Sequence, residues 1–199
     1  MKYLTDLSLS LDSITVLLLC ELVQSPTLGE ITRQGFTTGW AAHGSSATSI
    51  AGQKTILSRL TQQLSTAEAR GNNGLFKKVY KSTFKIALPA GTRGVPLDVA
   101  CEYWKILFGP SGANWTASSS DLTKPWLDWY LDFLNDKWKK AVNRDLWDQT
   151  LVFEEKTREG EDLEWWSEDG AWPGVIDEFV AWCKTEKGVG AGEGDAMEE

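Results

Sequence analysis

Apolar residues recur at helical spacing in nearly every segment of this sequence, and this pattern constrains the fold more than any other feature. Val175, Ile176, Phe179 and Val180, for example, fall on one side of a helix. Pro173 suits the first position of that helix, because the N–H that proline lacks would have no partner there. The same spacing predicts further helices over residues 12–23, 33–42, 55–68, 75–88, 96–108, 125–140 and 144–158. No segment has the alternation typical of a strand, so we predict an all-α protein.

The connections between these helices indicate a division into two lobes. Residues 45–53 form a polar connection of small residues, and residues 109–121 are rich in glycine and serine and lack periodicity. Residues 188–199 are glycine-rich and acidic, which is typical of a disordered tail. Thr32 and Asn143 are the expected N-caps of the helices that follow them. We predict an N-terminal helical lobe (1–108), a flexible loop (109–121), a C-terminal helical lobe (122–187) and a disordered acidic tail (188–199).

The charge and the cysteines narrow the class of partner and the compartment. The chain has 20 Lys and Arg against 28 Asp and Glu, a net charge of −8. Such an acidic field repels phosphate backbones, so we expect no nucleic acid partner and favour a basic protein partner. The longest apolar run, Ile14 to Cys20, is too short to cross a bilayer and no basic segment precedes it, so we expect neither a membrane span nor a signal peptide. An odd number of cysteines without a close pair indicates reduced thiols, which places the protein in the cytoplasm and nucleus.

Residues for catalysis or metal binding are scarce. The one histidine, His43, ends a predicted helix, where an imidazolium can simply interact with the helix dipole. A thiol enzyme would need this histidine beside Cys20 or Cys101, and nothing in the sequence indicates that arrangement. The segment from Gln24 to Glu30 lacks the carboxylate spacing of a calcium-binding EF-hand loop, and no cysteine and histidine spacing fits zinc. We expect no catalytic residue, no metal and no cofactor.

Tryptophan is unusually frequent in the second half of the chain. Of the 11 tryptophans, nine lie after residue 110. Indoles can fill a small helical core, or they can form contacts at a partner surface. For any one of them the core is the more common place. We expect Trp165 and Trp166 to be the most exposed pair, because neighbouring residues cannot both face one core.

Five blocks of this sequence together resemble one protein family. The block GAWPGVIDEFV at residues 170–180 is similar to the Gly-Ala-Trp-Pro-x-x-Ile-Asp-Asp/Glu-Phe-Val signature of the defective-in-cullin-neddylation family, which carries a potentiating-neddylation domain. LFKKVYKSTF at 75–84 resembles the family's Phe-Lys-x-Phe-Tyr-x-Phe-Thr-Phe helix, and PLDVACEYW at 96–104 resembles its Leu-x-x-Ala-x-x-Tyr-Trp helix. DLSL and SITVL within residues 6–17, and NRDLW at 143–147, complete the resemblance, which covers most of residues 6–184. Met1 falls inside the family's usual domain, so we expect neither the N-terminal ubiquitin-binding module nor the first helix pair.

The resemblance implies both a fold and a function. It implies a two-lobed helical domain with EF-hand-like helix pairs that bind no metal, acting as a scaffold without catalysis of its own. One face would bind the winged-helix region at the C-terminus of a cullin, and another the N-acetylated tail of the neddylation conjugating enzyme. The ubiquitin-like modifier would then pass from the cysteine of that enzyme to a cullin lysine. A non-catalytic helical adaptor with an unrelated partner is the alternative.

The family's cullin contact falls on Asp145, Ala171 and Asp177 in this sequence. Each residue also has an ordinary structural explanation. Asp145 would interact with the dipole in a first helical turn, Ala171 is a small turn residue, and Asp177 could be a solvated charge. Acidic groups on a polar helix face would nevertheless attract basic residues of a cullin. The closing helix would thus pack its apolar stripe into the core and present its other face to the cullin.

The resemblance also implies an apolar pocket for the acetylated methionine of the conjugating enzyme. Acetylation removes a charge that is costly to bury and leaves a short apolar anchor. The residues implied are all of core type, so packing alone would also explain them. Leu28 stands where relatives can place a polar residue, and Ile31 and Ile86 replace aromatic ones. The implied lining is Val16, Leu19, Leu28, Ile31, Ile86, Val95, Tyr103 and Ile106.

Overall fold

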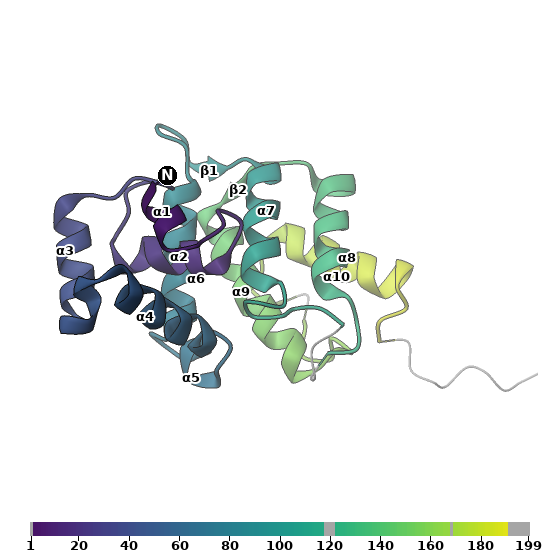
Figure 1. Ribbon diagram of the computed structural model, residues 1–199. Helices are drawn as coiled ribbons and strands as arrows, with labels where there is room; N and C mark the ends of the chain where they lie inside the picture. Colours follow the sequence, from purple (N-terminus) through teal and green to yellow (C-terminus); the bar gives the residue numbers. More distant parts are fainter. Residues whose placement is uncertain (1, 118–121, 168, 191–199) are drawn as a thin grey trace, which may run out of the picture.

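The computed structural model describes residues 2–117, 122–167 and 169–190, and most of its elements are helices (Figure 1). In chain order they are α1 (Lys2–Asp6), α2 (Ile14–Leu22), α3 (Arg33–Ala41), the 3-10 helix η1 (Ser45–Thr48), α4 (Ile50–Gln63), α5 (Ala67–Arg70), α6 (Leu75–Ala87), β1 (Gly94–Val95), α7 (Leu97–Phe108), α8 (Trp126–Phe133), the π-helical turn η2 (Leu134–Trp138), β2 (Val142–Asn143), α9 (Arg144–Glu159) and α10 (Gly174–Glu186). The predicted all-α class is confirmed. Figure 1 shows α1 to α5 on one side of the molecule and α8 and α10 on the other, with α7 and α9 between them. The exact division into lobes and the EF-hand likeness of the helix pairs stay predictions.

Local sequence signals place most of the longer helices as predicted. Thr32 Oγ1 accepts a hydrogen bond from Gly35 N at 3.0 Å, and Asn143 Oδ1 accepts one from Leu146 N at 2.8 Å, so both predicted N-caps are confirmed. The predicted helix over 125–140 is α8 followed by η2. η2 ends at Trp138. The next residue, Lys139, has a left-handed φ of 56°, which stops the helix.

The shortest elements differ from the prediction. β1 and β2 form an antiparallel ladder in which Gly94 lies opposite Asn143 and Val95 opposite Val142. A strand of two residues is too short to show alternation, so periodicity could not reveal it. Residues 45–53, predicted as a polar connection, contain η1 and the first turn of α4. α1 and α5, of 5 and 4 residues, are likewise too short to show a helical repeat.

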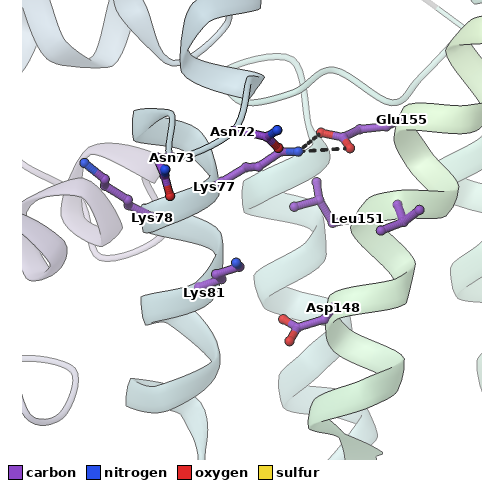
Figure 2. A pocket seen from close by; sticks show the side chains of 9 residues that line it. Asn72, Asn73, Lys77, Lys78, Lys81, Asp148, Leu151 and Glu155 are labelled. Carbon is purple, nitrogen blue, oxygen red and sulfur yellow. Dashed lines mark hydrogen bonds and ion pairs between the residues drawn. The ribbon is translucent and has the colours of Figure 1, made fainter.

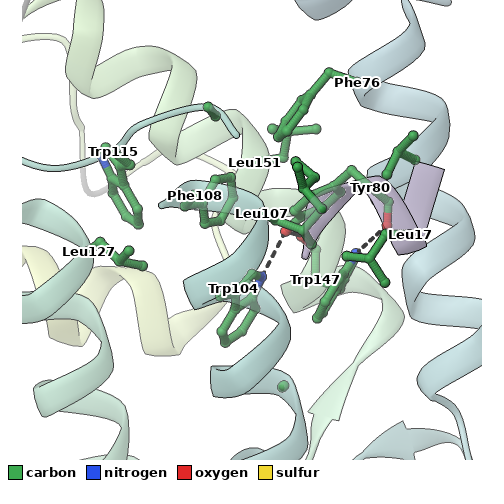
Figure 3. Close-up of a cluster of buried hydrophobic side chains, with 14 of the residues drawn as sticks. Leu17, Phe76, Tyr80, Trp104, Leu107, Phe108, Trp115, Leu127, Trp147 and Leu151 are labelled. Carbon is green, nitrogen blue, oxygen red and sulfur yellow. Dashed lines mark hydrogen bonds between the residues drawn. The ribbon is translucent and has the colours of Figure 1, made fainter. Parts of the chain in front are cut away.

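The core centres on aromatic side chains of α6, α7 and α9 (Figure 3). Trp104 and Trp147 are fully buried and stack with their ring centroids 5.1 Å apart. Trp104 Nε1 donates a hydrogen bond to Tyr80 Oη at 3.0 Å, and Tyr80 Oη donates one to Trp147 O at 2.6 Å. Trp147 Nε1 in turn donates to Tyr80 O at 3.1 Å. Every polar atom of these three buried rings therefore has a partner, which holds the three helices at fixed positions relative to one another.

The tryptophans of the second half also serve the core. Trp115 and Trp126 are 0% exposed. Trp165 and Trp166 are half-buried rather than exposed, which differs from the expectation. Trp165 Nε1 donates to Gly160 O at 2.8 Å, and the Lys184 ammonium lies 4.8 Å from the centroid of the Trp166 ring. The two neighbours thus use separate contacts because their rings point in different directions.

A buried ionic cluster fastens the segment after α7 to α9. Glu154 is 0% exposed and accepts hydrogen bonds of 2.6 Å from both Arg70 and Arg158. Both arginines also donate to Ala113 O, which secures residues 109–117 between α5 and α9. Burial raises the pKa of Glu154, and the positive charges of the two arginines offset part of that rise. Residues 118–121 of the predicted flexible loop and 191–199 of the predicted tail lie outside the described residues.

Candidate partner-binding sites

The turn that leads into α10 is shaped by an indole. The Trp172 ring lies 6.1 Å from Phe153 and 6.0 Å from Trp165, measured between centroids. A Cβ on Gly170 would lie only 2.8 Å from Trp172 Cδ1, so this position requires glycine. Ala171, between the two, is exposed. The packing of Trp172 therefore presents the small side chain of Ala171 to solvent, just before the helix begins.

Asp177 lies in the first turn of α10, on the side opposite the core-facing stripe. The predicted stripe is confirmed, because Val175, Ile176, Phe179 and Val180 are all buried. Asp177 is half-buried, and its Oδ1 atom is buried without a hydrogen-bond partner among the described residues. Buried carboxylate oxygens in proteins normally have a donor. A rotation of the half-buried Asp177 side chain would bring this oxygen to the surface, where a donor from another molecule would stabilise it.

Asp145 occupies the corresponding place on α9. It is exposed and lies in the first turn, two residues after the capping residue Asn143. β2 precedes it and is paired with β1, so the start of α9 is held in place. α9 and α10 pack together through Phe153 and Phe179, whose ring centroids are 5.6 Å apart. The structure thus places all three predicted cullin-contact residues at or before the first turns of two packed helices, and their grouping into one patch stays a prediction.

A second candidate site is an apolar cavity of about 340 Å³ beside α2. It brings together three of the predicted pocket residues, Val16, Leu19 and Ile31. Its other walls come from α1 and the turn after it, and from the α2–α3 connection. These walls contain residues that the sequence analysis missed: Tyr3, Leu4, Leu11, Cys20, Ser25 and Gly29.

The missed wall has a weak signal in the sequence. Tyr3, Leu4 and Leu7 fall at i, i+1 and i+4, which is one face of a helix, but α1 is only 5 residues long and ends one residue before Leu7. Leu7 is buried at 3% exposure and attaches α1 to the core. Tyr3 and Leu4 therefore form part of the cavity wall. A pattern of three residues is nevertheless too short to predict a helix from periodicity alone.

The remaining predicted pocket residues lie elsewhere. Leu28 is 39% exposed, and Val95 is 0% exposed within β1. Ile86 on α6 and Tyr103 on α7 are half-buried and do not line the cavity beside α2. Ile106 lines a different, more polar hollow next to Asp12 and Thr61.

The cavity contains neutral polar groups on an apolar wall. Burial raises the pKa of the Cys20 thiol and raises the pKa of Tyr3 to about 12, so both groups are protonated at neutral pH. Tyr3 Oη donates to Gln53 Oε1 at 2.8 Å. The Ser25 hydroxyl lies beside the Cys20 thiol, and a hydrogen bond between them offsets part of the rise in the pKa of Cys20. The cavity therefore suits an uncharged apolar group that carries a hydrogen-bonding atom.

Neither a metal-binding group of side chains nor a membrane-spanning helix is present in the described ranges 2–117, 122–167 and 169–190. No group of three or more histidine, cysteine, aspartate or glutamate side chains there could hold a metal ion. None of the helices there has the length and apolar character to cross a membrane.

An apolar cavity and a half-buried carboxylate on an all-helical scaffold are features that a partner-binding protein can use. Comparison with known sequences identifies the family. Residues 52–182 match the family described as cullin binding. Defective in cullin neddylation protein 1 of Pyricularia oryzae is 35% identical over 199 residues, which cover 97% of this chain and 68% of that protein. The protein of the same name from Yarrowia lipolytica is 33% identical over 92% of this chain and 68% of its own length. DCN1-like protein 3 of Homo sapiens is 32% identical over 97% of this chain and 58% of its own length.

The chain therefore belongs to the defective-in-cullin-neddylation family, as its sequence blocks predict.

Proposed function

We propose that this protein promotes cullin neddylation as a non-catalytic scaffold. It binds the C-terminal winged-helix region of a cullin with the first turns of α9 and α10. It also binds the N-acetylated tail of the neddylation conjugating enzyme in the cavity beside α2. Transfer of the ubiquitin-like modifier is then catalysed by the conjugating enzyme. Membership of the cullin-binding family and the names of its relatives support this role.

The observation that carries the proposal is the unpartnered Oδ1 atom of Asp177. A buried carboxylate oxygen without a donor is unfavourable in the free protein. A lysine or arginine of a cullin would supply both the donor and the opposite charge. Exposed Ala171 lies in the turn before the same helix and leaves room for close approach. Asp145 adds a second exposed carboxylate on the neighbouring helix.

The cavity beside α2 supports the second half of the proposal. Its walls are mostly apolar, and its polar side chains are two hydroxyls and a protonated thiol rather than charges. A charged amino terminus would lose its hydration there without a counter-charge, whereas an acetylated methionine carries no such charge. The Ser25 hydroxyl, which also bonds to the Cys20 thiol, lines the cavity as a polar contact for the acetyl group.

Scaffolding gives a physical reason for faster transfer. Two partners held on one molecule meet at an effective concentration on the order of millimolar, without any new catalytic group. Orientation of the two partners adds to this gain when the reacting atoms are aligned. Figure 1 shows α2 and α10 on different sides of the molecule, so both partners can be bound at once.

Calorimetric titration of a purified cullin C-terminal domain tests the cullin site. We expect Asp177→Asn to weaken binding by about 2 kcal/mol, because it removes the charge and keeps the shape. Glu178→Gln is the matched control, since this neighbouring carboxylate is exposed, and it should change the affinity less than about threefold. Binding by a folded Asp177→Asn variant at full strength would contradict the assigned face. Absence of binding by the parent protein would favour an adaptor with a different partner.

A further inference from the structure

A groove between α6 and α9 belongs to neither site described above. Its volume is about 500 Å³, and its walls carry lysines from α6 and carboxylates from α9 (Figure 2). Lys77, Lys78 and Lys81 lie on one side, and Asp148 and Glu155 on the other. In a chain with a net charge of −8, three lysines in less than two helical turns form an uncommon local concentration of positive charge.

The positive charge of this groove is only partly neutralised. Lys77 Nζ reaches Glu155 Oε1 at 3.0 Å, which Figure 2 shows as a contact across the groove. Lys78 and Lys81 are exposed and form no ion pair within the described residues. Lys85 continues the row one turn beyond Lys81 and is also exposed. Figure 2 shows Lys81 pointing toward α9 and Lys78 pointing away from it, so the groove has one free ammonium group inside and another at its edge.

The wall formed by α9 carries a carboxylate and an apolar side chain that a ligand could contact. Asp148 Oδ2 accepts a hydrogen bond from Arg144 Nε at 3.2 Å, but Asp148 Oδ1 is buried and has no partner among the described residues. Val152, also in the lining, is 39% exposed. A ligand that fits this groove would provide anions for the lysines, a hydrogen-bond donor for the exposed part of the Asp148 carboxylate and an apolar group for Val152.

These chemical features of the groove distinguish between classes of ligand. Inorganic phosphate or a nucleic acid backbone supplies anions for the lysines, but it offers no apolar side chain for Val152. An extended peptide supplies all three elements: side-chain carboxylates, backbone N–H donors and an apolar side chain. The side-chain amides of Asn72 and Asn73, at the start of α6, can also bond to a peptide backbone.

We propose that the groove between α6 and α9 binds an extended acidic peptide segment of a partner protein. Its carboxylates contact Lys78 and Lys81, and an apolar side chain rests on Val152. Asp145 lies on the same face of α9, because residues 145, 148, 152 and 155 are spaced at i, i+3, i+7 and i+10. The surface thus continues from an acidic end at the start of α9 to a basic groove along α6. It would admit a partner with charges of both signs.

Fluorescence anisotropy with a labelled nonapeptide tests the groove directly. The probe has four glutamates flanking a central leucine, and a second probe has serine in place of the leucine. We expect saturable binding of the first probe to the full chain. The double variant Lys78→Glu and Lys81→Glu should weaken it by roughly tenfold, because two attractions become repulsions. The variant Arg33→Glu and Arg59→Glu is the control, since it makes the same change in net charge on α3 and α4 and should leave binding within about twofold.

A second comparison tests the apolar contact. Val152→Ser should weaken binding of the leucine probe and leave binding of the serine probe unchanged, because only the leucine contacts this side chain. All substituted side chains of the double variants are exposed, so loss of the fold is not expected, and circular dichroism checks it. Absence of binding, equal loss in the two double variants, or full displacement of the probe by inorganic phosphate would each overturn the proposal. None of these results depends on cullin binding, so they do not bear on the scaffold function.

Discussion

At the scale of single residues, the unpartnered polar atoms are the most informative. The aromatic core satisfies its own polar groups, as the mutual bonds of Tyr80 and Trp147 show. Asp177 Oδ1 and Asp148 Oδ1 are buried without partners in the part of the chain that is described, and so is the indole nitrogen of Trp166. The two carboxylate oxygens lie at proposed binding surfaces, whereas the indole nitrogen does not. The unpaired carboxylates therefore support the two proposals because carboxylate oxygens normally have a donor.

Two isoleucines that the family resemblance assigns to one pocket lie in different places. Ile31 lines the apolar cavity beside α2, whereas Ile106 lines a separate hollow. We expect Ile31→Ala to weaken binding of an N-acetylated methionine peptide by about tenfold, because part of the apolar wall is lost. Ile106→Ala is the matched control and should change binding by less than about twofold. Isothermal calorimetry measures both, and equal losses would show that the binding cavity extends to α7.

Glu161 predicts a pH-dependent contribution to stability. Its carboxylate accepts hydrogen bonds from Thr123 N at 2.9 Å, Lys124 N at 2.9 Å and Trp126 Nε1 at 2.7 Å. Partial burial alone would raise the pKa of Glu161, but these hydrogen bonds outweigh it and lower the pKa. The ionised form is thus favoured by the folded state, and its contribution is present above the pKa of the unfolded chain and lost as the pH falls through the lower folded value.

The substitution Glu161→Gln tests this contribution. We expect the variant to have a lower free energy of unfolding than the parent at pH 7. The difference should shrink as the pH falls below about 4, because the parent carboxylate then becomes protonated. Urea unfolding followed by tryptophan fluorescence at several pH values measures it. A difference that stays constant with pH would show that the charge of Glu161 is not responsible.

At the scale of elements, length determines what could be predicted from the sequence. α6, α7, α9 and α10 each contain 12 or more residues, and their apolar spacing was sufficient to predict them. α1, α5 and the β1–β2 ladder are too short to carry a period, and they form because neighbouring elements pack against them. The short length of α1 also limited the prediction of the cavity beside α2. Val16, Leu19 and Ile31 were implied by the family resemblance, whereas the wall from α1 was not.

The start of α9 predicts a stability effect. The Asn143 side chain satisfies the N–H of Leu146, and its backbone belongs to β2. Asn143→Ala should lower the free energy of unfolding by about 1 kcal/mol, because that N–H loses its partner. Asn143→Asp keeps the acceptor and should retain most of the stability. Chemical denaturation of the two variants checks this, and equal stability of Asn143→Ala and the parent would contradict the role of the cap.

At the scale of the whole molecule, a packed core lies between the two proposed binding surfaces. α2 and its cavity lie on one side, and the start of α10 lies on another (Figure 1). Between them, the Tyr80, Trp104 and Trp147 network and the Arg70–Glu154–Arg158 cluster hold α6, α7 and α9 together. Rigid spacing of this kind is what a scaffold requires, because the effective concentration of two bound partners depends on the geometry between them.

The rate of cullin neddylation, measured against the concentration of this protein, tests the scaffold function most directly. The assay contains fixed amounts of cullin C-terminal domain and of the conjugating enzyme charged with its modifier. A scaffold that must hold both partners at once predicts a bell-shaped curve, because excess scaffold separates the partners onto different molecules. Asp177→Asn should lower the maximum and move it to higher concentration. A rate that rises to a plateau, or no acceleration at any concentration, would contradict the account.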